Sequence, residues 1–159
     1  MPKLIVAIMY QKNKKKIYNL AKEGLIRKFG PISRESKPYN FDKFTSYYVK
    51  EMGKGLIKRF IIFKKQIKKE DLAKIRLFTA KIEKKYSKHN RRQINLDPGY
   101  LTKTELVLAS FKRGTNYKEK ISDKVYAHKV LEFKKGKVIT FWHTFPDYRE
   151  KKEIFLGLC

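Results

Sequence analysis

The chain is almost free of cysteine, since Cys159 at its last position is the only one. A single thiol excludes an internal disulfide and a cysteine-rich zinc site. Long apolar runs are also missing, and none approaches the roughly 20 residues needed to cross a bilayer. The apolar stretch at residues 4–10 has no small-residue cleavage site behind it, which favours a buried strand over a signal peptide. These absences predict a cytoplasmic protein with no membrane partner.

Acidic residues are scarce as well: 15 Asp and Glu stand against 40 Lys and Arg, which gives a net charge of +25 and a pI near 10.1. Basic domains of this kind bind phosphates and release their counterions, so the balance favours nucleic acid, RNA more than DNA, or a ribonucleoprotein as partner. The alternative is composition inherited from an AT-rich or thermophilic lineage, although heat adaptation usually raises Glu together with Lys.

Apolar residues are present in sufficient number for a core, because hydrophobic residues make up 42% and aromatic residues 14% of the 159 positions. This composition excludes an intrinsically disordered protein and predicts one domain over residues 1–159. The expected elements of the first half are a strand (4–10), a helix (12–30), a partly extended segment (32–41), a loop (45–55) and a strand (56–67).

The second half begins with a helix at 68–90, whose apolar residues recur at helical spacing. Periodicity leaves residues 104–111 open between a strand and a short buried helix. The remaining expected elements are a turn at Asp97-Pro98-Gly99 within 91–102, a hairpin around Lys134-Lys135-Gly136-Lys137 and one last helical turn in the tail.

The order of these elements predicts an α+β fold with a ferredoxin-like βαββαβ core, its sheet extended by the C-terminal hairpin. Two helices would cover one face of the sheet, and the other face is expected to stay open. An open basic face with exposed aromatic residues is one way in which small domains hold single-stranded RNA.

One candidate site gathers carboxylates from separate segments, with Glu51, Asp97 and Asp147 as the catalytic candidates. Together they suit a divalent metal, or one of them suits a general base. The expected ligand-binding companions are Tyr48, Asn95, Tyr100, Tyr148 and Arg149. The alternative is structural, because an Asp-Pro-Gly run is typical of a turn. A functional carboxylate site would make the protein a small enzyme or a ligand-binding protein.

A second metal hypothesis rests on His128 and His143, which we expect to face each other across the hairpin and to need a carboxylate as third ligand. The alternative is that both are ordinary histidines at the surface of the sheet. Neither hypothesis has a ligand spacing strong enough for us to name a metal or a cofactor.

Nucleic-acid contact is the other candidate function, because basic clusters lie beside predicted turns and helix ends. Aromatic residues near them offer faces on which bases stack, unless they fill the core. The candidate stacking residues are Tyr47, Tyr48, Tyr117, Tyr126 and Trp142. The candidate phosphate-binding residues are Lys14, Lys15, Lys16, Lys64, Lys65, Arg91, Arg92, Lys134 and Lys135.

Several longer motifs recur in one order along the chain. They are FGP (29–31), YYVKEMGKGLIKRF (47–60), NLDPGYLTKTELVLAS (95–110) and a hairpin that runs into TFPDYR (144–149). In this order the chain resembles the bacterial family known as domain of unknown function 4416. That family has no established activity, so the resemblance implies no reaction and no cofactor. A phosphate-binding P-loop is missing too, since residues 51–55 lack its spacing and its Lys-Ser/Thr end.

Overall fold

A single antiparallel sheet forms the centre of the protein, whose computed structural model describes residues 2–114 and 117–156. Within those residues the strands follow the order β2-β4-β1-β5-β6-β8-β7, while β3 pairs with β4 and β9 with β8. The strands are β1 (Lys3–Gln11), β2 (Ile32–Glu35), β3 (Tyr39–Asn40), β4 (Leu56–Gln66), β5 (Ile94–Leu101), β6 (Glu105–Ser110), β7 (Glu119–Lys120), β8 (Tyr126–Lys134) and β9 (Lys137–Thr140).

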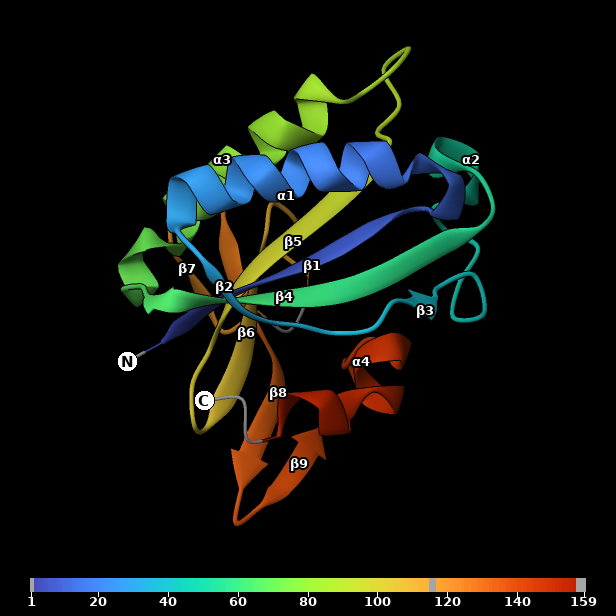
Figure 1. The fold of residues 1–159 in the computed structure, drawn as a ribbon. Coiled ribbons are helices and arrows are strands. Elements are labelled where there is room, and N and C mark those ends of the chain that lie inside the picture. Colours follow the sequence, from blue (N-terminus) through green and yellow to red (C-terminus); the bar gives the residue numbers. More distant parts are fainter. Residues whose placement is uncertain (1, 115–116, 157–159) are drawn as a thin grey trace.

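Helices lie on both faces of this sheet (Figure 1). The long helices α1 (Lys15–Phe29) and α3 (Leu72–Lys85) lie side by side over one face, and the short α4 (Pro146–Glu150) lies below the other. A single turn of helix, α2 (Val49–Met52), follows the loop after β3. The described residues also form three 3-10 turns: η1 (Lys12–Lys14), η2 (Lys69–Asp71) and η3 (Lys152–Phe155).

Strand β1 is buried on both faces, which explains why its sequence is continuously apolar. Leu4, Val6 and Ile8 join the core under α1 and α3. Ile5 and Ala7 join a second core, which includes residues of β6, β8, α4 and η3. The expectation of an open second face is therefore wrong, because the C-terminal elements fold back and cover it.

The Asp97-Pro98-Gly99 run lies inside β5 and is not a turn, contrary to the prediction. These residues pair in sequence with Ala7, Val6 and Ile5 of β1. The ladder between β5 and β6 covers only Gly99–Leu101, so Pro98 and its missing N–H lie outside it.

Gly99 is required by a close approach between strands rather than by a turn. A Cβ built on Gly99 would lie 2.2 Å from the Val107 carbonyl oxygen and 2.8 Å from Cδ2 of Leu108. Only glycine lets β6 approach β5 so closely. Gly99 is therefore needed because it has no side chain, and not for a positive φ.

Other boundaries were predicted with mixed success. Residues 104–111, left open between strand and helix, contain β6. The predicted loop at 45–55 contains α2. The hairpin is confirmed, since Lys134 pairs with Lys137 and the two residues between them have positive φ.

Candidate functional site

The pairing register brings polar residues of separate strands onto one face of the sheet. Met9 of β1 lies between Lys58 of β4 and Asn95 of β5. The next row on that face consists of Phe60, Ala7 and Asp97. Directly paired residues point to the same face, so Asp97 lies beside the second core, and Lys58 and Asn95 lie beside a third apolar cluster around Met9 on the same face.

Asp147 of α4 lies buried against this face and is held by two donors. Lys58 Nζ lies 2.7 Å from its Oδ2, and the Tyr39 hydroxyl donates to the same oxygen at 2.8 Å. The Lys58 ammonium also lies 4.6 Å from the ring centroid of Tyr148 and 5.0 Å from that of Phe41. An ion pair with this degree of burial and enclosure anchors α4 to β4, which is a structural role.

Glu51 of α2 is joined to Asp97 through two intermediate side chains. Arg92 donates from Nε and Nη2 to the two carboxylate oxygens of Glu51, at 2.8 and 2.9 Å. Its Nη1 donates to Asn95 Oδ1 at 2.7 Å, and Asn95 Nδ2 donates to Asp97 Oδ2 at 2.9 Å. The hydrogen bonds from Arg92 hold the pKa of Glu51 below its ordinary value. Glu51 is thus ionised and fully engaged.

Asp97 is the least engaged of the three predicted carboxylates. It is half-buried, and among the described residues it forms no ion pair and accepts its side-chain hydrogen bond from Asn95. Burial together with the charge of Asp97 raises the pKa of Tyr48 to about 12. The same two causes raise the pKa of Tyr148, whose hydroxyl is buried and has no hydrogen-bond partner in the described residues.

The structure brings together six of the predicted residues: Tyr48, Glu51, Asn95, Asp97, Asp147 and Tyr148. It separates two others from them. Tyr100 belongs to the core on the opposite face of β5, and its hydroxyl lies 3.3 Å from Glu105. Arg149 donates to Thr140 Oγ1 at 2.9 Å and so ties α4 to the end of β9.

Metal-binding geometry is not found in the described part of the chain, where no three His, Cys, Asp or Glu side chains form a group that could hold an ion. The two histidines do not face each other across the hairpin, contrary to the prediction. His143 follows the end of β9 and lies 3.1 Å from the Lys129 carbonyl oxygen, while His128 lies 2.9 Å from that of Lys112.

Three buried or half-buried acids were missed by reasoning from sequence. Glu83 lies between Arg76 and Arg92, Glu35 between Lys22 and Arg59, and Glu105 beside Lys118. Burial raises the pKa of Glu83 despite its arginine partners. A signal existed for Glu83, because Arg76, Thr79 and Glu83 lie on the apolar stripe of α3 at helical spacing.

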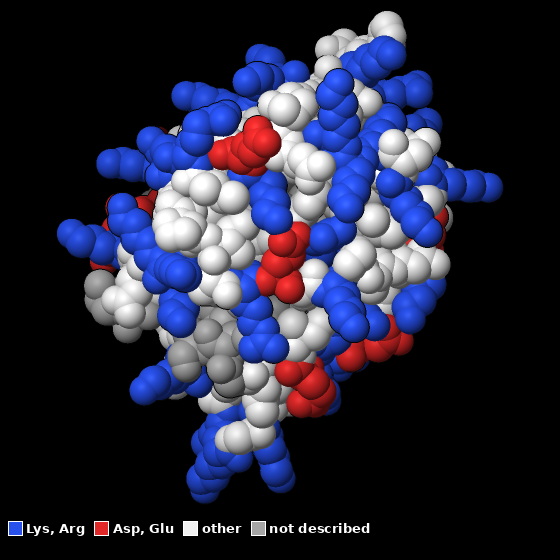
Figure 2. Space-filling view, in the orientation of Figure 1, with Lys and Arg blue, Asp and Glu red and all other residues white. Residues whose placement is uncertain are grey.

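The predicted basic residues are mostly exposed, but their charge does not mark a site. Figure 2 shows Lys and Arg over the whole visible face, with isolated Asp and Glu between them. Two of the nine candidates are engaged internally: Lys14 donates to Gln93 at 2.8 Å, and Arg92 lies in the Glu51 network. The other seven lie exposed: Lys15, Lys16, Lys64, Lys65, Arg91, Lys134 and Lys135.

Aromatic rings and cations are paired on both sides of the chain neighbours Lys112 and Arg113. Lys112 donates to the Tyr47 hydroxyl at 3.1 Å, and the adjacent Arg113 lies 5.4 Å from the ring centroid of Tyr117. Tyr117 packs edge-on against Tyr126, with 5.2 Å between ring centroids, and Lys120 lies 6.0 Å from the Tyr126 ring. We call Tyr47, Lys112, Arg113, Tyr117, Lys120 and Tyr126 the aromatic–cationic surface.

Two predicted stacking residues are strongly exposed: Trp142 at 80% and Tyr47 at 67%. The alternative expectation that Trp142 fills the core is therefore wrong. Tyr48 is instead half-buried, where it packs edge-on against Phe41 with 5.8 Å between ring centroids.

A family model describes nearly the whole chain: DUF4416, a domain of unknown function, matches residues 1–156. The chain belongs to this family. The resemblance inferred from the motifs is thereby confirmed. No curated protein and no solved structure matches the chain.

We call the six gathered residues Tyr48, Glu51, Asn95, Asp97, Asp147 and Tyr148 the Asp97 cluster. The DUF4416 match includes both this cluster and the aromatic–cationic surface, and it carries no activity. No helix among the described residues is long and apolar enough to span a membrane.

Proposed function

We propose that this DUF4416 protein binds single-stranded RNA, alone or within a ribonucleoprotein, through the aromatic–cationic surface. The observation that carries the proposal is that two neighbouring cations each meet a ring: Lys112 contacts Tyr47, and Arg113 lies beside Tyr117, which packs against Tyr126. Charge alone would not select this surface, because cations cover the molecule. It combines the strongly exposed Tyr47 with the packed rings of Tyr117 and Tyr126, and each of the three rings has a cation beside it.

This pairing of rings and cations suits the two chemical faces of a nucleic acid strand. Lysine and arginine neutralise phosphates, while tyrosine rings stack on bases with little regard to sequence. Trp142 offers a further exposed ring on the chain segment that follows the basic hairpin of Lys134 and Lys135. The proposal places the protein in the cytosol, in agreement with its single cysteine.

We also propose a ferredoxin-like core within the larger sheet. It is supported by the antiparallel order β2-β4-β1-β5, in which α1 follows β1 and α3 follows β4. Both helices share one core with β1, and β6 to β9 extend the sheet beyond β5.

Fluorescence anisotropy with labelled oligouridine tests RNA binding and its location. Tyr117→Leu and Tyr126→Leu preserve the charge, and each is expected to weaken binding about tenfold through lost stacking. The double variant Lys112→Gln/Arg113→Gln is expected to reduce the salt dependence of log K by ~1.4, or ~0.7 for each phosphate contact.

The control is the double variant Lys64→Gln/Lys65→Gln, which removes equal charge from exposed positions outside the surface. It is expected to change affinity much less. Equal weakening by both charge variants, with no effect of either tyrosine variant, would show unspecific attraction to a protein of charge +25 and contradict the proposal.

A second candidate function is the binding of a small ligand at Asp97. It is favoured by the Tyr148 hydroxyl, which is buried without a partner in the described residues near the weakly engaged Asp97. A thermal-shift screen of polyols and primary amines tests it, since these groups donate hydrogen bonds to a carboxylate. A hit should be lost in Asp97→Asn while RNA affinity is unchanged or slightly stronger. A hit that survives in Asp97→Asn contradicts this candidate, and so does a screen without hits.

A further inference from the structure

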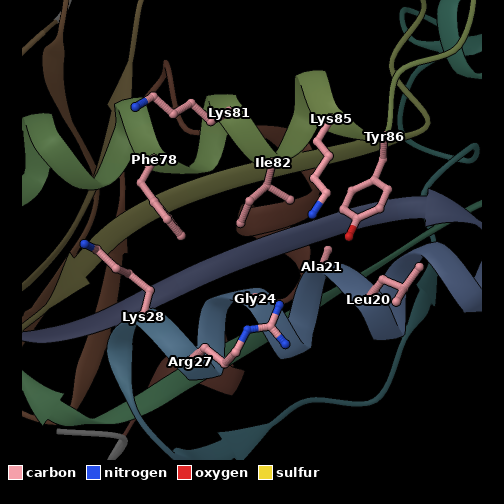
Figure 3. Close-up of a pocket in the computed structure, with 10 residues that line it drawn as sticks. All are labelled: Leu20, Ala21, Gly24, Arg27, Lys28, Phe78, Lys81, Ile82, Lys85 and Tyr86. Atoms are coloured by element: carbon pink, nitrogen blue, oxygen red, sulfur yellow. The ribbon is translucent and has the colours of Figure 1, made fainter.

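A groove runs between α1 and α3 on the outer side of the helical layer (Figure 3). Its volume is about 420 Å³, within the range of small-molecule sites in proteins. The groove is remote in sequence from the aromatic–cationic surface, and the two share no residue. Its lining consists of Leu20, Ala21, Gly24, Arg27, Lys28, Phe78, Lys81, Ile82, Lys85 and Tyr86.

The lower part of the groove is apolar. Ala21 and Gly24 of α1 form one side of this apolar lining, and Phe78 and Ile82 point toward them from α3 (Figure 3). A Cβ on Gly24 would have Ile82 Cδ1 as its nearest neighbour, at 3.8 Å, so the glycine leaves a hollow between the helices. Leu20 at one end is 38% exposed, which leaves apolar surface in contact with water.

The rim of the groove is cationic: Arg27 and Lys28 lie on α1, and Lys81 and Lys85 lie on α3. No acidic side chain lines the groove. None of these four cations takes part in an ion pair with any described residue; Lys28 and Lys85 instead lie over the rings of Phe78 and Tyr86 in the lining. Four uncompensated positive charges around an apolar hollow suit an anionic partner.

We propose that this groove binds an anionic amphiphile, a single acyl chain that ends in a carboxylate or phosphate. The chain would lie on the apolar floor, and the head group would meet the rim cations. A nucleobase fits less well, because its polar edges require hydrogen-bond partners, and Tyr86 supplies the only neutral polar side-chain group of the lining. The proposal is independent of RNA binding, which uses a different surface.

Calorimetric titration with hexanoate, octanoate, decanoate and dodecanoate, below their micelle concentrations, separates chain binding from charge attraction. Each buried methylene is expected to tighten binding about fourfold, or ~0.8 kcal/mol, until the groove is filled. Acetate and inorganic phosphate, which carry only the head group, are expected to bind far more weakly. Lauroyl lysophosphatidic acid tests whether a phosphate head is preferred to a carboxylate.

Gly24→Leu is the blocking variant, because leucine favours helix and its side chain would occupy the hollow. We expect decanoate affinity to fall at least tenfold while circular dichroism remains unchanged. Arg27→Gln/Lys85→Gln is expected to weaken all chain lengths by a similar factor. The charge-matched control is Lys15→Gln/Lys16→Gln, two exposed cations of the same helix outside the groove.

Affinity that does not depend on chain length would overturn the proposal. The same holds for a folded Gly24→Leu protein that binds decanoate like the wild type. Should Gly24→Leu fail to fold, the comparison of Arg27→Gln/Lys85→Gln with its control Lys15→Gln/Lys16→Gln decides, and equal decanoate affinity of the two would overturn the proposal. Displacement of decanoate by oligouridine would assign the groove to nucleic acid and overturn the proposal as well.

Discussion

The ammonium of Lys58 lies 2.7 Å from the carboxylate of Asp147, although 89 positions separate these residues in the chain. Both side chains are buried, and together they join β4 to α4 across the second core. Desolvation makes such a pair costly to form, and the loss of one partner leaves an uncompensated charge in the interior. The pair therefore specifies where the C-terminal helix lies.

A double-mutant cycle on this pair is expected to show strong coupling. Asp147→Leu and Lys58→Met should each lower the free energy of unfolding by ~3–5 kcal/mol, because each leaves one buried charge without its partner. The double variant should be more stable than either single variant, since it leaves no unpaired charge in the interior. Urea denaturation measures all four proteins, and simple additivity of the two losses would contradict this role.

Arg92→Lys tests the connection between α2 and the Asp97 cluster. Lysine keeps the charge but cannot bind both oxygens of Glu51 and also reach Asn95, so we expect a loss of ~1–3 kcal/mol. Amide hydrogen exchange in Val49–Met52 should become faster. Arg91→Lys is the control. Arg91 is adjacent to Arg92 but exposed, so this substitution should change the free energy of unfolding by less than ~0.5 kcal/mol.

Stability is expected to fall in acid partly through Glu105. Burial alone would raise the pKa of this carboxyl, but hydrogen bonds from Lys118 and the charges of Lys129 and Lys69 bring it below its ordinary value. A carboxyl with a lowered pKa stabilises the folded state above its unfolded pKa, near 4.5, and this contribution disappears as the pH falls through the folded pKa.

Glu105→Gln should therefore be less stable than the wild type at neutral pH by ~1–3 kcal/mol, with a difference that shrinks as the pH falls below the unfolded pKa. Urea denaturation at stepped pH measures this difference. Exposed Glu70→Gln is the matched control and should leave the pH profile unchanged. A gap between wild type and Glu105→Gln that stays constant with pH would refute the assignment.

Two glycine-to-alanine substitutions are expected to have opposite signs. Gly99→Ala places a methyl group against the Val107 carbonyl and should destabilise by at least ~1–3 kcal/mol. Gly24→Ala meets no atom closer than 3.8 Å and should stabilise α1 by ~0.5–1 kcal/mol. Thermal and urea unfolding compare both, and equal effects would contradict the close approach of β5 and β6.

Sequence patterns predicted much of the fold where a single periodicity dominated. The continuous apolar run of β1, the stripe of α3 and the Lys135-Gly136 turn are local features, and each appears as expected. The Asp97-Pro98-Gly99 run misled because turn chemistry and close strand approach require the same residue types. Nothing local in the sequence indicates that Val107 lies against Gly99.

The candidate site was predicted only in part, because its contacts also join segments that are distant in the sequence. Glu51, Asp97 and Asp147 do gather near one face, but Arg92 and Lys58 occupy two of these carboxylates, and both cations come from other segments. Tyr100 was misplaced because a strand turns alternate residues to opposite faces, which separates it from Asp97.

By itself the sequence determined the α+β class, the family, the excess of positive charge and the positions of the long helices, because these follow from composition and local periodicity. Only the tertiary structure decided which charges are paired, which aromatic residues are exposed and where α1 and α3 leave a groove. Those outcomes depend on contacts between distant segments, and such contacts form only when the sheet brings the segments together.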